Sequence, residues 1–139
     1  MTRVRSGQPA DLDALTRAQT ALTEPAPELL AGVLTGEGPG TVLVAVDGAP
    51  VGYLLAIPGP EAMYVAELAV HPNRQREGHG SALLSALFER THDHQTVCLT
   101  VAADNETARQ FYDHHGFEPA ERLEDHFEGS DGLVLVRPG

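Results

Sequence analysis

The spacing of apolar residues along the chain predicts a series of strands and helices. Runs of β-branched and other apolar residues predict strands at residues 2–6, 41–46, 51–57, 62–70, 96–101, 119–124 and 133–137. Apolar residues at helical spacing predict one helix that begins at residues 8–11 and ends before Pro25, and further helices at residues 28–34, 80–90 and 105–116. The predicted order is therefore β-α-α-β-β-β-α-β-α-β-β.

The connections between these elements favour one mixed sheet. Residues 47–50, Asp-Gly-Ala-Pro, join two strands in a way that is typical of a hairpin, whereas later strands alternate with helices. This pattern predicts an α/β or mixed α+β fold with helices on both faces of the sheet. The chain has no internal repeat and no linker long enough to separate domains, so residues 1–139 are expected to form a single domain.

Composition excludes several kinds of partner. Twenty acidic residues face nine arginines and no lysine, which gives a formal charge of −11. This charge disfavours nucleic acids and anionic membranes and mildly favours cationic partners. Cys98 is the only cysteine, no apolar window is long enough to span a membrane, and the N-terminal residues lack the apolar core of an export signal. We therefore expect a cytoplasmic protein.

The segment between the fourth strand and the third helix carries the clearest chemical signal. Residues 70–84 read Val-His-Pro-Asn-Arg-Gln-Arg-Glu-Gly-His-Gly-Ser-Ala-Leu-Leu. Gly78 and Gly80 let an anion approach the backbone, and the helix that follows points its positive end at the same place. A phosphate or pyrophosphate group fits this pattern, although a plain strand-to-helix connection would use the same glycines. The spacing matches neither G-x-G-x-x-G nor the P-loop, which needs a lysine.

Glu67 is a charged residue within an apolar strand. Alternation places it on one face with Met63, Val65 and Ala69, where a carboxylate without partners would be costly to bury. Two interpretations follow. Glu67 is either a general base in a cleft that water reaches, or a structural carboxylate bonded to backbone or arginine.

The last predicted helix offers a second group of polar residues. Asn105, Ala108 and Tyr112 lie near one face of it, at spacings of three and four. Asn105 is a good N-cap, a role compatible with ligand contact. Tyr112 is either a core residue or a proton donor, because a phenol that titrates near ~10 is suited to protonating a thiolate.

The seven histidines do not predict a metal site. His92 and His94 are separated by one residue, and His114 and His115 are adjacent, which is not the spacing of known zinc motifs. Stabilisation of helix C-termini explains these pairs more simply. We therefore expect no metal.

Two sequence blocks together resemble the GNAT superfamily, the Gcn5-related N-acetyltransferases. Residues 75–80, Gln-Arg-Glu-Gly-His-Gly, follow the family signature Q/R-x-x-G-x-G/A, and Ala-Val-His-Pro precedes them. Residues 105–117 are similar to the family's second block, N-x-x-A-x-x-F-Y-x-x-x-G-F. The predicted order of elements agrees with that family over essentially the whole chain. The resemblance implies a mostly antiparallel sheet of six to seven strands, in which the fourth and fifth strands splay apart.

The resemblance also implies acetyl-CoA as co-substrate. Backbone groups of Leu68, Ala69 and Val70 would pair with the pantetheine arm, and Asn105 would contact the same arm. The pyrophosphate would be held by Gln75, Arg76, Glu77, Gly78, His79, Gly80 and Ser81. Two of these depart from the family pattern. Glu77 brings negative charge, which Arg74 or Arg76 can offset, and His79 replaces the usual aliphatic residue.

The activity implied by the resemblance is direct transfer of an acetyl group to a primary amine of a small molecule or peptide. Glu67, alone or through water, would remove a proton from the amine, and Tyr112 would protonate the departing thiolate. The acceptor would be held by residues 23–32 and 126–132, where acidic residues predict a cationic acceptor. Homodimers are common in this family, so a second copy is one expected partner.

Two other classes of function compete with this one. A non-catalytic acyl-CoA-binding module would bind CoA without turnover. A histidine-dependent metal hydrolase would need bound zinc.

Overall fold

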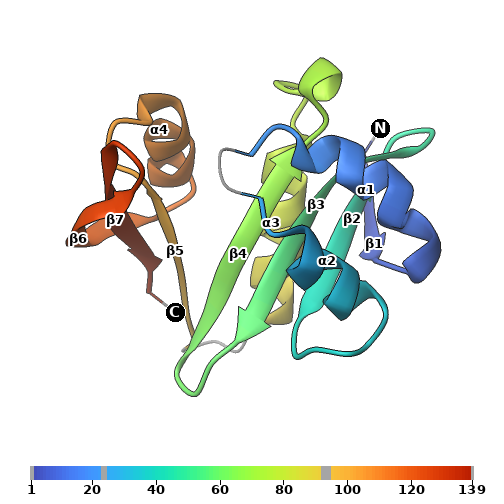
Figure 1. Ribbon diagram of the computed structural model, residues 1–139, viewed down its shortest axis with the longest axis horizontal. Coiled ribbons are helices and arrows are strands. Elements are labelled where there is room, and N and C mark those ends of the chain that lie inside the picture. Colours follow the sequence, from blue (N-terminus) through green and yellow to red (C-terminus); the bar gives the residue numbers. More distant parts are fainter. Residues whose placement is uncertain (1, 23–24, 92–94, 139) are drawn as a thin grey trace. The chain divides into compact units, whose positions relative to one another are not determined.

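The observed helices and strands follow the predicted order. The computed structural model describes residues 2–22, 25–91 and 95–138 (Figure 1). The strands are β1 (Arg3–Ser6), β2 (Thr41–Val46), β3 (Pro50–Pro58), β4 (Ala62–Val70), β5 (Thr96–Ala102), β6 (Glu118–Phe127) and β7 (Ser130–Arg137). The helices are α1 (Leu12–Gln19), α2 (Pro27–Leu34), α3 (His79–Arg90) and α4 (Glu106–His114), with 3₁₀ turns at Pro9–Asp11 and Pro72–Arg74.

The strand order confirms the predicted mixed fold class. The sheet has seven strands in the order β1-β2-β3-β4-β5-β7-β6. The pairs β1–β2, β2–β3, β5–β7 and β6–β7 are antiparallel, and β4 pairs with β5 in parallel through Ala62, Met63 and Tyr64. The parallel ladder joins Ala62, Met63 and Tyr64 to Thr96, Val97 and Cys98.

The last hairpin is longer than the sequence predicts. The expected strands at residues 119–124 and 133–137 extend to Glu118–Phe127 and Ser130–Arg137. Between them only Glu128 and Gly129 are left for the turn, and Gly129 has φ 76°. Glycine adopts this left-handed conformation without strain, which allows the tight connection.

The described residues fall into two compact units. The first unit contains residues 1–58 and 65–91, and the second contains residues 59–64 and 92–139. β4 therefore begins in the second unit and ends in the first. None of the described helices has the length and apolar character needed to cross a membrane.

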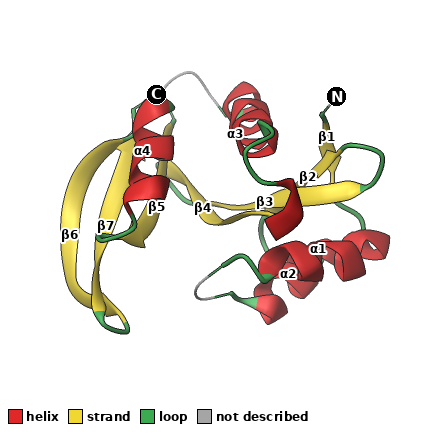
Figure 2. Ribbon diagram, turned by 90° about the horizontal axis from the view of Figure 1, so that it is seen from above, coloured by secondary structure: helices red, strands yellow, loops and turns green. Residues whose placement is uncertain are grey.

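The core of the first unit forms on both faces of its strands. α1 and α2 lie on one face, and α3 lies on the other (Figure 2). β2 and β3 are buried along most of their length, as expected for strands covered on both sides. The cluster beneath α1 and α2 contains Leu15, Ala18, Leu30, Leu34, Val42, Val44, Tyr53, Leu55 and Ala69. This cluster surrounds the part of β4 that carries Glu67.

The second unit combines β5, β7 and β6 with α4. Leu99, Leu135 and Pro119 are in register across the three strands. Leu135 and Pro119 line a pocket together with residues of α4, so this face of the strands is the one that α4 covers. Phe117 ends the connection after α4 and is 2% exposed. It anchors the helix to the hairpin.

Gly52 on β3 marks a close approach to β4. A Cβ atom at this position would lie 2.7 Å from the carbonyl oxygen of Ala69 and 3.2 Å from the Cα of Val70. Neither backbone atom can move without disturbing the strand pairing. Position 52 therefore has no room for a side chain, because β3 lies against the last residues of β4 there.

We expect Gly52→Ala to lower the free energy of unfolding by about 1–3 kcal/mol, because overpacking forces the backbone apart. The control is Gly32→Ala in α2, where a Cβ atom would meet nothing within 4 Å. Alanine should stabilise that helical position by up to ~1 kcal/mol. Denaturant unfolding of both variants measures the difference. Equal stabilities would contradict the close approach.

Candidate active site

The connection from β4 to α3 forms a turn that opens directly into the helix. Gly78 is the N-cap residue of α3, has φ 89° and offers no side chain to cap the first turn. A Cβ atom at Gly78 would meet nothing within 4 Å, so the requirement for glycine comes from φ alone. The first N–H groups of an α-helix have no partner within the helix. The helix, predicted to begin at Gly80, begins at His79. Because Gly78 has no side chain, its backbone can be approached closely.

The negative charge of Glu77 is offset by its neighbours. Its Oε1 atom accepts a hydrogen bond from Nε of Arg74 at 3.0 Å and lies 3.1 Å from Nε2 of His79. Arg74 first, and His79 next, lower the pKa of the Glu77 carboxyl. This confirms the expected pairing with Arg74. A second nitrogen of Arg74 bonds Asp47 at 2.6 Å, so one guanidinium lies between two carboxylates.

His79 fills the space beneath the turn. It is 2% exposed, and its Nδ1 atom lies 2.7 Å from the hydroxyl oxygen of Thr2. Its other ring nitrogen faces Glu77. His79, which departs from the family pattern, is thus a buried residue with a polar contact at each ring nitrogen. Its contact with Thr2 links the turn to the start of the chain.

Asp47, Glu77 and His79 are also the group of described residues with metal-ligand atoms close together, all within 4.8 Å of one another. Arg74 already places a positive charge against both carboxylates. A metal ion would have to displace that guanidinium. Of the histidines considered from sequence, His92 and His94 lie outside the described residues, and Nδ1 of His115 lies 2.7 Å from the Phe111 carbonyl oxygen in α4.

The end of β4 brings its predicted residues to the same turn. Leu68, Ala69 and Val70 are the last three residues of the strand. Nε2 of Gln75 donates a hydrogen bond to the Val70 carbonyl oxygen at 3.2 Å. The end of the strand and the start of the turn are therefore held together within the first unit.

Glu67 is buried and fully surrounded by donors. It is 6% exposed, and its carboxylate accepts hydrogen bonds from the Tyr53 hydroxyl (2.9 Å), the Gln19 amide (3.1 Å) and the Ala26 backbone N–H (2.8 Å). Burial first, and the charge of Glu67 next, raise the pKa of the Tyr53 phenol. Tyr53 is thus a hydrogen-bond donor at neutral pH. The predicted bonding to backbone is present, and amide and phenol groups take the place of an arginine.

The second unit carries Asn105 and Tyr112 on α4. Asn105 is the N-cap residue, and its Oδ1 atom accepts a hydrogen bond from the Ala108 N–H at 3.1 Å. Tyr112 is 9% exposed, with its ring edge-on to Phe111 at 5.2 Å and to Phe117 at 5.4 Å. Burial raises the pKa of the Tyr112 phenol. The ring is therefore a core contact, and its hydroxyl stays protonated.

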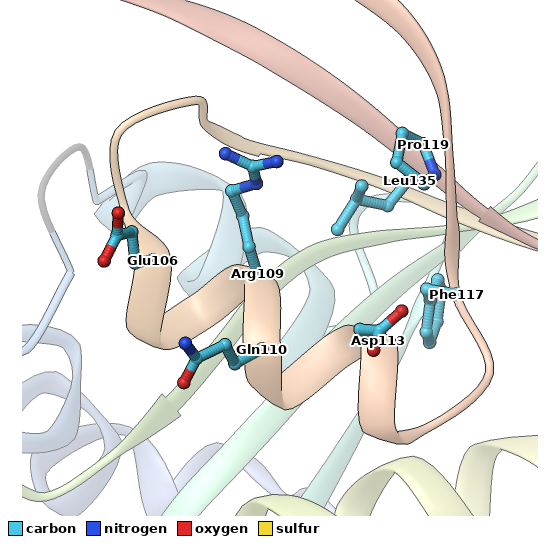
Figure 3. Close-up of a pocket in the computed structure, with 7 residues that line it drawn as sticks. All are labelled: Glu106, Arg109, Gln110, Asp113, Phe117, Pro119 and Leu135. Atoms are coloured by element: carbon cyan, nitrogen blue, oxygen red, sulfur yellow. The ribbon is translucent and has the colours of Figure 1, made fainter.

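Part of the α4 surface lines a pocket of about 330 Å³ (Figure 3). It is lined by Glu106, Arg109, Gln110, Asp113, Phe117, Pro119 and Leu135. The four helical residues follow the i, i+3, i+4, i+7 spacing of one helix face. Asn105 and Tyr112 do not line this pocket. This pocket is therefore distinct from the residues of α4 that the sequence predicts as site residues.

A second pocket, of about 460 Å³, lies at the turn of the last hairpin. Asp104, Asp125 and Asp131 line it together with Arg122, and the Arg122 guanidinium bonds Asp131 at 2.8 Å. The Asp125 N–H first, and Arg122 next, lower the pKa of Asp131. Three carboxylates against one guanidinium leave the pocket with net negative charge.

Sequence reasoning missed the partners of the buried groups. Tyr53 and Gln19 each sit on an otherwise apolar surface, 0% and 4% exposed. A buried phenol or amide needs a hydrogen-bond partner. A tyrosine and a glutamine at otherwise apolar positions could therefore have indicated a buried polar partner. The pairing of β3 with β4 was needed to identify Glu67 as that partner.

Comparisons with known proteins place the chain in a family. The model of the acetyltransferase (GNAT) family matches residues 10–117. The chain belongs to this family. L-2,4-diaminobutyric acid acetyltransferase from Nocardia farcinica is 37% identical over 73 residues, which are 48% of this chain. The match covers 38% of that relative, so the chain spans well under half of its length.

Solved structures share the fold over nearly the whole chain. Ard1 from Thermoplasma volcanium has a TM-score of 0.84 and 27% identity, with 99% of this chain and 97% of that chain covered. Arabidopsis thaliana NAA60 in complex with acetyl-CoA has a TM-score of 0.81 and 20% identity, with 99% and 98% covered. The predicted family and fold are confirmed.

The two buried tyrosines predict a loss of stability at high pH. Their folded-state pKa values are raised, so Tyr53 and Tyr112 favour the folded state fully below the unfolded pKa of ~10 and progressively less above it. Ultraviolet titration of phenolate should show both ionising only as the protein unfolds. The chain has no lysine to titrate in the same range. In denaturant all tyrosines should titrate near ~10. The half-exposed Tyr64 can ionise in the folded protein, so phenolate formation by more than this one tyrosine before unfolding would contradict the observed burial.

Proposed function

We propose that this chain transfers an acetyl group from acetyl-CoA to a primary amine. The observation that carries the proposal is the turn from Gln75 to Ser81, which follows the family signature and opens α3 without a capping side chain. Membership of the acetyltransferase family supports it. When bound, acetyl-CoA would supply the acetyl group as a thioester with a good leaving group.

The residues of the turn fit a pyrophosphate. Backbone N–H groups at the positive end of a helix bind such anions. Glu77 is the one carboxylate among the predicted ligands of the turn, and its contacts with Arg74 and His79 offset its charge. Gln75, Arg76, Gly78, Gly80 and Ser81 would complete this part of the site. Leu68, Ala69, Val70 and Asn105 would hold the pantetheine arm.

We propose Tyr112 as the general acid. The amine nitrogen would bond to the acetyl carbon while the carbon–sulfur bond breaks, and Tyr112 would give its proton to the sulfur. Burial raises the pKa of the Tyr112 phenol, so the hydroxyl is protonated near neutral pH. The role of Glu67 as general base stays a prediction. Its hydrogen bonds to Gln19, Ala26 and Tyr53 also support a structural role.

The acceptor is proposed to be cationic. The pocket at the last hairpin is lined by Asp104, Asp125 and Asp131, and its net charge is negative. Its residues 129–131 fall within the segment 126–132 that is predicted to hold the acceptor. The relative from Nocardia farcinica is named for a diamino acid. An acceptor with a second positive charge would match these carboxylates.

Acetyl-CoA should raise the melting temperature, with a stabilisation of about 2.7 kcal/mol at a concentration 100 times the Kd. Thiol release should then require an amine from a panel of diamines, neutral amines, peptides with free α-amines and lysine. Cationic acceptors should have the highest kcat/KM. Absence of binding would contradict the proposal. Binding without thiol release for any amine would instead support the non-catalytic acyl-CoA-binding module.

Tyr112→Phe should lower kcat by about 100-fold or more, because general acid catalysis typically contributes that much. The affinity for acetyl-CoA should change by less than about threefold, since the ring and its packing remain. Tyr64→Phe is the matched control, because Tyr64 is a half-exposed tyrosine of the same unit. Steady-state kinetics and calorimetric binding measure both quantities. A parallel loss of affinity and kcat would exclude the acid role.

A further inference from the structure

The Glu67 carboxylate joins both ends of the connection between α1 and α2. Gln19 is the last residue of α1, and Ala26 is the N-cap residue of α2. Nε2 of Gln19 lies 3.1 Å from Oε1 and 3.5 Å from Oε2, and the Ala26 N–H donates to Oε2 at 2.8 Å. One side chain of β4 therefore bonds the residue before the connection and the residue that ends it.

This carboxylate also replaces a missing helix cap. Ala26 has no side chain that can accept a hydrogen bond, and Pro27 has no N–H. Glu67 supplies the acceptor from another strand and places negative charge at the positive end of α2. The position of the first turn of α2 thus depends on a residue far away in sequence.

Tyr53 fixes the carboxylate from the side of the sheet. Its hydroxyl donates to Oε1 at 2.9 Å, and the tyrosine is fully buried in the core cluster below α1 and α2. A carboxylate has about four lone-pair positions. Three donors, one of them near both oxygens, leave little capacity to accept a proton from a substrate.

We propose that Glu67 is a positioning residue that holds the last residue of α1, Gln19, and the N-cap residue of α2, Ala26, in the arrangement that receives the acceptor. Proton removal from the amine then falls to water or to another group. The proposal rests on the proposed function, because residues 23–32 are expected to contact the acceptor.

Two variants separate positioning from base catalysis. In Glu67→Gln the new amide offers one acceptor oxygen and turns an N–H₂ group toward a remaining donor, so one end of the connection is released. In Gln19→Met the carboxylate stays, and only its bond to α1 is lost. Glu89→Gln is the charge-matched control, since Glu89 is an exposed glutamate on α3 of the same unit.

The first two variants should raise the acceptor KM about tenfold, a change that corresponds to ~1.4 kcal/mol. The KM for acetyl-CoA should change less than about twofold. The acidic limb of the kcat/KM pH profile should be the same in Glu67→Gln as in the unmodified protein. A kcat loss of 100-fold or more with loss of that limb in Glu67→Gln, together with normal kinetics in Gln19→Met, would overturn the proposal in favour of a base.

Amide hydrogen exchange tests the positioning role of Glu67 without requiring turnover. Exchange at Ala26 and in residues 20–22 should be faster in Glu67→Gln and Gln19→Met than in Glu89→Gln, and unchanged rates would overturn the proposal. If Glu67→Gln does not fold, Gln19→Met decides the question. If no amine supports thiol release by the unmodified protein, the proposed function fails. The exchange result still tests whether Glu67 positions the ends of α1 and α2.

Discussion

Burial of the Glu67 carboxylate is the constraint on which the first unit depends. A buried carboxylate is tolerated only when hydrogen-bond donors surround it, and here the donors come from α1, the start of α2 and β3. The core cluster of α1, α2, β2, β3 and β4 packs around the same point. Hydrophobic packing alone would let two short helices settle in several ways over a sheet. The directed bonds to one carboxylate select a single placement, which is a specificity role that buried polar groups can have.

Carboxylates are also paired with neighbouring groups at the turn before α3. An anion-binding turn gains from backbone N–H groups and loses from nearby carboxylates. Arg74 is held between Asp47 and Glu77, and His79 faces Glu77 from inside. These contacts link the turn to Asp47 and His79, and a Cβ atom at Gly78 would meet nothing within 4 Å. In the proposed site, Arg74 would act through the carboxylates that it neutralises, in addition to any direct contact with a phosphate.

Local patterns could be predicted from the sequence, and contacts between distant residues could not. Strands and helices followed from apolar periodicity, and Arg74 was one of the two nearby arginines expected to offset Glu77. β6 was predicted too short because nearly all its residues are exposed, so it shows no alternation. Its length comes from pairing with β7. The partners of Glu67 depend on the register of β3 against β4 and on where α1 ends, and neither is encoded in a short window.

The proposed positioning role of Glu67 would also bear on which amine the proposed reaction accepts. The amine must lose a proton before it can attack, and a carboxylate whose oxygens already accept three hydrogen bonds is a poor recipient. Amines that are partly neutral near pH 7 need less help. An α-amino group, with a pKa of ~7.7–8.0, meets this condition far better than a lysine side chain at ~10.4. The acidic pocket at the last hairpin adds a second requirement, a positive charge elsewhere on the acceptor. For the proposed acetyl transfer, these two constraints would favour α-amines of cationic peptides, or diamines in which one amine is less basic, over isolated lysine side chains.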